Sequence, residues 1–304
     1  MPRDKPSLTA RKVASDFLFS VEDPRVARFA PADSIRATYE VLAAAGRLKP
    51  WMVSLIKAPW YQRFGRKLAE RMAPGQMLYM VLRKRFFDDE VRDAIAAGAT
   101  EVLVVGAGYD TLCLRLAPEY PEVTFVELDH PPTHREKLRA IETMGVMRSN
   151  LRLEAVDLGE RTLTEILSES PVWNVTGKAV VVAEGVLPYL GVEEVEAFLA
   201  AVRSSTGAGS RLLISYLHEV ELGRVFRGIL GQALNWSLHL VGEPFRWGVS
   251  SEGVEPFLIA NGYRRLGDEA RYDLELRYLE RSMDADLTVA RLERVVAAEP
   301  LAKI

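Results

Sequence analysis

Short runs of β-branched and other apolar residues recur between helical patterns in the middle of this chain. Five runs are predicted as strands, and they cover residues 101–105, 123–128, 151–156, 179–183 and 211–216. Strands that alternate with helices are typical of βαβ units, whose strands form a largely parallel sheet covered by helices. The pattern therefore predicts an α/β fold.

The segments on either side of these strands have a different character. Residues 1–98 show helical spacing and no convincing strand, whereas residues 263–266 and 272–279 are predicted as two antiparallel strands joined by a short polar turn. Residues 218–256 are rich in aromatic residues and glycine and are expected to form an insertion or lid. We predict a helical cap over residues 1–98 and one α/β unit, with a seven-stranded sheet, over residues 99–304.

Composition excludes several classes of protein. The 304 residues include 39 Lys or Arg and 42 Asp or Glu, a net charge of −3, and this balance argues against a nucleic-acid partner. One cysteine excludes an intramolecular disulfide, and four histidines leave little material for a metal site, so none is predicted. The chain lacks a signal-like N-terminus and an apolar run of about 18 residues, so we expect a cytoplasmic protein without a membrane span.

A glycine turn follows the first predicted strand. Gly106 and Gly108 allow the backbone to approach a ligand closely, although such a turn is often only a tight strand-to-helix connection. Asp129 lies 21 residues after Gly108 and ends the second strand, where its carboxylate could accept hydrogen bonds from ribose hydroxyls. Thr111 replaces the third glycine of the dinucleotide pattern, which disfavours NAD and FAD and favours S-adenosylmethionine, a cofactor without phosphates.

Further candidates follow the third and fourth predicted strands. Asp157 and Leu158 could bind the amino group and ring face of adenine, and Glu184 could bind the amino group of the methionine part or counter the sulfonium charge. Each acid alone could equally cap a helix or lie in a solvated loop. Together they follow successive strands, and ligands of open α/β sheets bind at that edge.

Four segments, in this order and spacing, resemble the leucine carboxyl methyltransferase family of S-adenosylmethionine-dependent O-methyltransferases. These segments are residues 104–111, 126–131, 156–158 and 183–190. The resemblance extends over roughly residues 8–217 and implies a Rossmann-like class I methyltransferase fold. It also implies methyl-ester formation, as in bacterial members of the family that methylate polyketide carboxylates.

The resemblance adds two basic residues to the candidate cofactor site. It implies that Arg83 clamps the carboxylate of the cofactor and that Lys12 helps to bind it, although either could simply be an exposed residue on a helix. The chain departs from the family pattern at Lys84, where bacterial members often have Thr. It also has Pro188 where a flexible apolar residue is usual, and this change could reshape the acceptor pocket.

The chemistry of the methyl acceptor decides which catalytic groups are needed. A carboxylate is already ionised at pH 7 and needs no general base, so Tyr189 is predicted only to orient it. A phenol or alcohol would need a base, and His218 is then the candidate. Apolar residues within 226–247 and 51–61 could wall a bulky apolar acceptor site, although such spacing is more often typical of a core.

The sequence therefore favours a methyltransferase that esterifies a small apolar acid, such as a polyketide. Three alternatives stay open: a phenol or hydroxyl O-methyltransferase, an NAD-dependent oxidoreductase, and a cofactor-binding protein without catalysis. The expected partner is a small-molecule acid, and oligomeric state is not predicted.

Overall fold

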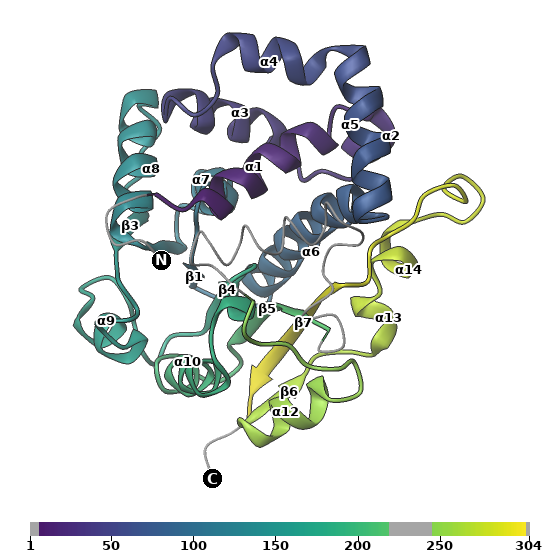
Figure 1. Cartoon of the computed structure of the whole chain (residues 1–304). Coiled ribbons are helices and arrows are strands. Elements are labelled where there is room, and N and C mark those ends of the chain that lie inside the picture. Colours follow the sequence, from purple (N-terminus) through teal and green to yellow (C-terminus); the bar gives the residue numbers. More distant parts are fainter. Residues whose placement is uncertain (1–5, 219–244, 302–304) are drawn as a thin grey trace.

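The computed structural model describes residues 6–218 and 245–301, and these residues are built around one β-sheet (Figure 1). Its strands run in the order β3-β2-β1-β4-β5-β7-β6. They are β1 (Glu101–Val105), β2 (Thr124–Asp129), β3 (Leu151–Ala155), β4 (Ala179–Ala183), β5 (Arg211–Leu217), β6 (Tyr263–Arg265) and β7 (Glu293–Pro300). The first five are parallel to one another, and β7 is antiparallel to both β5 and β6. The prediction of a mostly parallel, seven-stranded sheet with an antiparallel C-terminal pair is confirmed.

The position of the last strand was predicted wrongly. Most of residues 272–279 lie in two short helices, α13 (Glu269–Tyr272) and α14 (Leu274–Tyr278), and none of them lies in a strand. Asp273 caps α14, because its carboxylate accepts hydrogen bonds from the backbone N–H groups of the second and third residues of that helix.

The seventh strand lies nearer the C-terminus of the chain. β7 sits between β5 and β6, so both of its edges are paired. The side chains from Val295 to Ala298 are all buried, so both of its faces are covered as well. A strand buried on both faces lacks the alternation of apolar and polar residues that reveals a half-exposed strand. The long connection through α13 and α14 replaces the short polar turn that was expected.

The described residues before β1 form helices, as predicted. They are α1 (Leu8–Ser20), α2 (Pro24–Ala27), α3 (Ser34–Ala44), α4 (Pro50–Lys57), α5 (Pro59–Met72) and α6 (Gln76–Ala96). In Figure 1, α4 lies at the outer end of the molecule, with α1 and α3 between it and the sheet. Helix α6 runs from this group of helices to the sheet, where it contacts β4 and β5.

The remaining helices connect or cover the strands. They are α7 (Leu112–Leu116), α8 (Pro131–Met144), α9 (Leu163–Glu169), the 3-10 helix η1 (Leu187–Tyr189), α10 (Val192–Ser204) and α12 (Val254–Ala260). Most of the predicted insertion, residues 219–244, lies outside the described residues. No helix in the described ranges is both long and apolar enough to cross a bilayer.

A buried ion pair joins the sheet to α8. The Nζ atom of Lys137 lies 2.5 Å from Oε2 of Glu127 on β2, and both side chains are almost fully buried. Burial raises the pKa of Glu127, and the nearby ammonium partly offsets this rise. Each charge therefore depends on the other, because either alone would be left uncompensated in the core.

Removing one charge of this ion pair should destabilise the fold more than removing both charges. We expect Lys137→Met to lower the free energy of unfolding by about 3–5 kcal/mol, and the additional change Glu127→Leu to restore much of it. The loss in Lys137→Met should shrink as pH falls, because the folded protein then favours protonated Glu127 more strongly than the unfolded chain does. Urea unfolding followed by circular dichroism measures all three quantities. A double variant as unstable as the single one would contradict this view of the pair.

Candidate cofactor and active site

The turn after β1 requires glycine for two separate reasons. Gly106 and Gly108 have φ angles of +67° and +51°, a region that other residues rarely adopt. A Cβ atom on Gly106 would lie 2.6 Å from Cγ2 of Val186, and one on Gly108 would lie 3.0 Å from Cβ of Ala10. The turn is thus packed between the segment after β4 and the start of α1.

Asp129 lies directly beside this turn. Its carboxylate accepts hydrogen bonds from the backbone N–H of Gly108 and, at 2.6 Å, from that of His130. Burial raises the pKa of Asp129 above its ordinary value of 3.8, and the two backbone donors partly counter that rise. The acid predicted for ribose binding is therefore placed at the glycine turn, and its role there stays a prediction.

Asp157 lies near the same edge of the sheet, after β3. One of its carboxylate oxygens accepts a hydrogen bond from the N–H of Gly159 at 2.9 Å, and the other lies 3.7 Å from Nε2 of His130. The local hydrogen bond is the loop-capping role that an isolated acid can have. Its neighbour Leu158 has an exposed fraction of 39% and presents an apolar surface at this edge.

The guanidinium of Arg83 lies 2.9 Å from Oε1 of Glu184, the residue after β4, and 2.5 Å from Oε2 of Glu293, the first residue of β7. The Arg83 side chain is only 5% exposed. The structure therefore brings together Arg83 and Glu184, two residues predicted to bind the methionine part of the cofactor.

Lys84 and Asp110 extend this cluster to the glycine turn. The Nζ atom of Lys84 lies 2.5 Å from Oδ2 of Asp110 and 3.3 Å from Oε1 of Glu184. Asp110 also accepts a hydrogen bond from the N–H of Leu112, the first residue of α7, at 2.7 Å. We call Arg83, Lys84, Asp110, Glu184 and Glu293 the ion cluster.

The members of the ion cluster keep one another charged. Burial acts to lower the pKa of Arg83, but Glu293 and Glu184 outweigh it and raise that pKa further above its ordinary value. Burial also acts to lower the pKa of Lys84, but the carboxylates of Asp110 and Glu184 outweigh it, so this pKa is raised. The pKa of Asp110 is lowered, because Lys84 outweighs the effect of burial.

Sequence reasoning missed three members of the ion cluster. Lys84 departs from the family pattern and Asp110 lies within the glycine segment, but neither is predicted from the sequence to belong to the site. Lys84 directly follows Arg83 and Asp110 lies two residues after Gly108, and these positions are the signals that could have revealed them. Glu293 belongs to the strand that was not predicted, so nothing in the sequence linked it to Arg83.

Lys12 lies apart from the ion cluster. Its ammonium pairs with Asp16 one turn further along α1, and more than half of its side chain is exposed. No hydrogen bond or ion pair within the described ranges joins it to Arg83. This is the exposed helical position that was the alternative interpretation of Lys12, and its cofactor role stays a prediction.

Tyr189 and His218 follow β4 and β5, as expected. Tyr189 ends η1 and is partly buried, with its ring centroid 5.1 Å from that of Phe245. His218 directly follows β5 and is partly buried, and its backbone N–H donates to the carbonyl of Leu292 at 2.9 Å. Both lie after strands whose carboxyl ends carry the site, and their catalytic roles are untested.

Two segments, residues 51–61 and 226–247, are predicted to wall the acceptor site. Trp51 and Trp60 have exposed fractions of 63% and 66%, so in this structure they face solvent rather than an enclosed acceptor site. Of the segment 226–247, the residues up to 244 lie outside the described ranges. Trp247 is buried and packs against Phe257, which is a core position.

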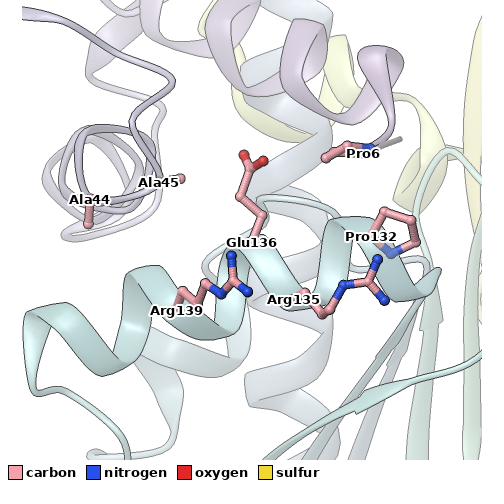
Figure 2. A pocket seen from close by; sticks show the side chains of 7 residues that line it. All are labelled: Pro6, Ala44, Ala45, Pro132, Arg135, Glu136 and Arg139. Carbon is pink, nitrogen blue, oxygen red and sulfur yellow. The ribbon is translucent and has the colours of Figure 1, made fainter. Parts of the chain in front are cut away.

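A separate cavity of about 340 Å³ lies between the end of α3 and α8. Figure 2 shows Glu136 pointing from α8 towards the space between Ala45 and Pro6, with Arg135 and Arg139 on the same helix. Glu136 is paired with Arg47, and none of the predicted site residues lines this cavity.

Comparison with known proteins shows which family this chain resembles. A sequence model of the leucine carboxyl methyltransferase family matches residues 19–203. A Mycobacterium marinum protein named as a candidate S-adenosyl-L-methionine-dependent methyltransferase is 32% identical over 151 residues, which cover 47% of this chain and 44% of that protein. A Saccharopolyspora erythraea protein with the same description is 31% identical over 166 residues, 54% of this chain and 56% of that protein. The chain thus spans about half the length of the curated relatives that it matches, and their names agree with the predicted cofactor.

Solved structures agree on the fold. A candidate methyltransferase from Thermobifida fusca aligns with a TM-score of 0.52 at 16% identity, covering 92% of this chain and 98% of that one. A DUF574 family protein from Streptomyces avermitilis aligns with a TM-score of 0.57 at 12% identity, covering 88% and 99%. At these identities the likeness concerns the fold alone.

The requirement for glycine at position 106 can be tested by substitution. We expect Gly106→Ala to abolish measurable S-adenosylhomocysteine binding, because the new Cβ combines an unfavourable φ with a clash against Val186. Gly145→Ala is the matched control, since Gly145 has nearly the same φ, +66°, but no atom within 4 Å of a new Cβ. Calorimetry should give wild-type affinity for the control. Equal losses in both variants would contradict a specific requirement for glycine in the turn after β1.

Proposed function

The chain belongs to the leucine carboxyl methyltransferase family, and we propose that it transfers the methyl group of S-adenosylmethionine to the carboxylate of a small, apolar acid, such as a polyketide acid. The ion cluster carries this proposal. It lies where β1 and β4 are neighbours in the sheet and the chain order reverses, which is where open α/β sheets bind ligands.

The charge of the ion cluster suits this cofactor. Its two cations and three carboxylates leave one net negative charge, whereas S-adenosylmethionine carries a sulfonium, an ammonium and a carboxylate and has one net positive charge. Oε1 of Glu293 is buried and has no hydrogen-bond partner among the described residues. A buried carboxylate oxygen without a donor is costly, so an ammonium group bound there would be favourable.

The residues of the ion cluster retain the capacity to bind the methionine part. Arg83 donates from Nε to Glu184 and from Nη1 to Glu293. A guanidinium has five N–H donors, so others remain for the carboxylate of the cofactor. Glu184 would hold the ammonium, in competition with Lys84, which lies 3.3 Å from it.

The adenosine part would lie along the ends of β1, β2 and β3. Asp129 accepts two backbone hydrogen bonds, and a carboxylate can accept about four, so it could also accept from both ribose hydroxyls. Asp157 would accept from the adenine amino group, and the exposed side chain of Leu158 would cover the ring face.

Methyl transfer to a carboxylate needs no general base from the protein. Bound S-adenosylmethionine supplies a methyl group on a positively charged sulfur. An acceptor carboxylate is ionised at neutral pH, so the chain has to orient its oxygen in line with that methyl group and exclude water. Tyr189 would orient the acceptor, a role supported by its position five residues after Glu184 and its partial burial against Phe245.

The proposed reaction is tested with labelled S-adenosylmethionine and a panel of acceptors. We expect label in a base-labile methyl ester when apolar carboxylic acids are supplied, and little transfer to short hydrophilic acids or peptide termini. A base-stable ether that depends on His218 would instead assign the enzyme to phenols or alcohols. Transfer only to hydrophilic acids would contradict the apolar acceptor.

Substitution of Asp129 tests the adenosine end of the site. We expect Asp129→Asn to weaken S-adenosylhomocysteine binding about tenfold to a hundredfold, because charge-assisted hydrogen bonds to the ribose are lost. Asp286→Asn is the matched control, since Asp286 is 65% exposed and pairs only with Arg25 among the described residues. Wild-type affinity should decline as pH falls through the raised pKa of Asp129, above 3.8, because protonation removes an acceptor. Calorimetry that gave both variants wild-type affinity would exclude a ribose contact by Asp129.

A further inference from the structure

Helices α4 and α5 form an outer layer of the molecule with little buried surface. None of the eight residues of α4 is buried, and of the fourteen residues of α5 only Gln62 is buried. Figure 1 shows α4 at the outer end and α5 along one side of the helical group. These helices therefore have surfaces that the rest of the described structure does not cover.

The exposed side of α5 carries a stripe of large apolar residues. Trp60, Phe64 and Leu68 are spaced four residues apart, so they lie along one face, and their exposed fractions are 66%, 66% and 37%. Trp51 on α4 is 63% exposed. Large apolar side chains that are exposed together on one surface usually mark an interaction site.

Positive charge accompanies this apolar stripe. Residues 47–72 contain seven Lys or Arg and one Glu, a net charge of +6, within a chain whose net charge is −3. Arg63, Lys67 and Arg71 repeat at the same four-residue spacing on the row next to the apolar stripe, and all three are exposed. Within the described ranges none of these three forms an ion pair, whereas Arg47 and Arg66 pair with Glu136 and Asp23.

We propose that this face of α5, with Trp60, Phe64 and Leu68 beside three basic residues, binds the surface of a bilayer that contains anionic lipids. A helix with a strongly basic polar face and Trp, Phe and Leu on the other lies in the interfacial plane of a membrane. Aromatic rings enter the headgroup region, and long Lys and Arg side chains reach the phosphates. Two copies of this face would repel each other, which favours the lipid surface over a second copy of the chain.

The proposal is independent of the methyl acceptor, and it is tested by sedimentation with vesicles. The full chain is mixed with vesicles of phosphatidylcholine alone or with added phosphatidylglycerol. We expect binding to the anionic vesicles, weak binding to the neutral ones, and release at high salt.

Two triple variants separate the apolar and electrostatic contributions. Trp60→Gln, Phe64→Gln and Leu68→Gln remove the stripe, and Arg63→Gln, Lys67→Gln and Arg71→Gln remove the charges, each charge being worth about fivefold in binding. The matched control replaces three exposed apolar residues elsewhere, with exposed fractions of 56%, 56% and 61%: Ile259→Gln, Leu276→Gln and Met283→Gln. We expect the control to bind like wild type and both test variants to lose binding, while all three keep wild-type affinity for S-adenosylhomocysteine.

Two results would overturn the proposal. One is a wild-type chain that does not sediment with anionic vesicles, and the other is binding that survives in both test variants. If vesicles do not bind and light scattering shows a dimer that the apolar variant dissociates, the face belongs to a second copy of the chain.

Discussion

The ion pair between Arg83 and Glu184 is the interaction on which the site depends. It joins α6, the last helix of the N-terminal group, to the end of β4 in the sheet. Glu293 on β7 forms an ion pair with the same guanidinium. Lys84 pairs with both Glu184 and Asp110 and so links β4 to the glycine turn. Because buried charges are tolerated only when they are paired, this cluster fixes how the helices sit on the sheet and leaves acidic groups where a cationic cofactor would bind.

The sheet places the other predicted groups around this cluster. β1 lies between β2 and β4, so the residues that follow these strands meet at one edge. Asp129 is held at the glycine turn by backbone hydrogen bonds, and Asp157 lies close to it through His130. Backbone hydrogen bonds and buried ion pairs therefore hold these side chains in place.

The sequence predicted the parallel strands well because β1 and β4 are short, mostly apolar runs and β3 alternates apolar with charged residues. It failed at β7, where burial on both faces removes any alternation and where the run from Val295 to Ala298 is half alanine. The missed strand also concealed Glu293. Spacing alone does not say whether an apolar face is covered, so the sequence could not reveal that Trp51 and Trp60, expected as possible pocket walls, are exposed.

The role of Glu184 in binding the methionine part of the cofactor is tested most directly by calorimetry, in which wild type and Glu184→Gln are each titrated with two ligands. S-adenosylhomocysteine has the amino-acid end that the ion cluster would bind, whereas methylthioadenosine lacks it. We predict that the substitution weakens S-adenosylhomocysteine binding and leaves the affinity for methylthioadenosine unchanged. Equal losses for both ligands, or no loss for either, would contradict the assignment of Glu184 and its cluster to the methionine part of the cofactor.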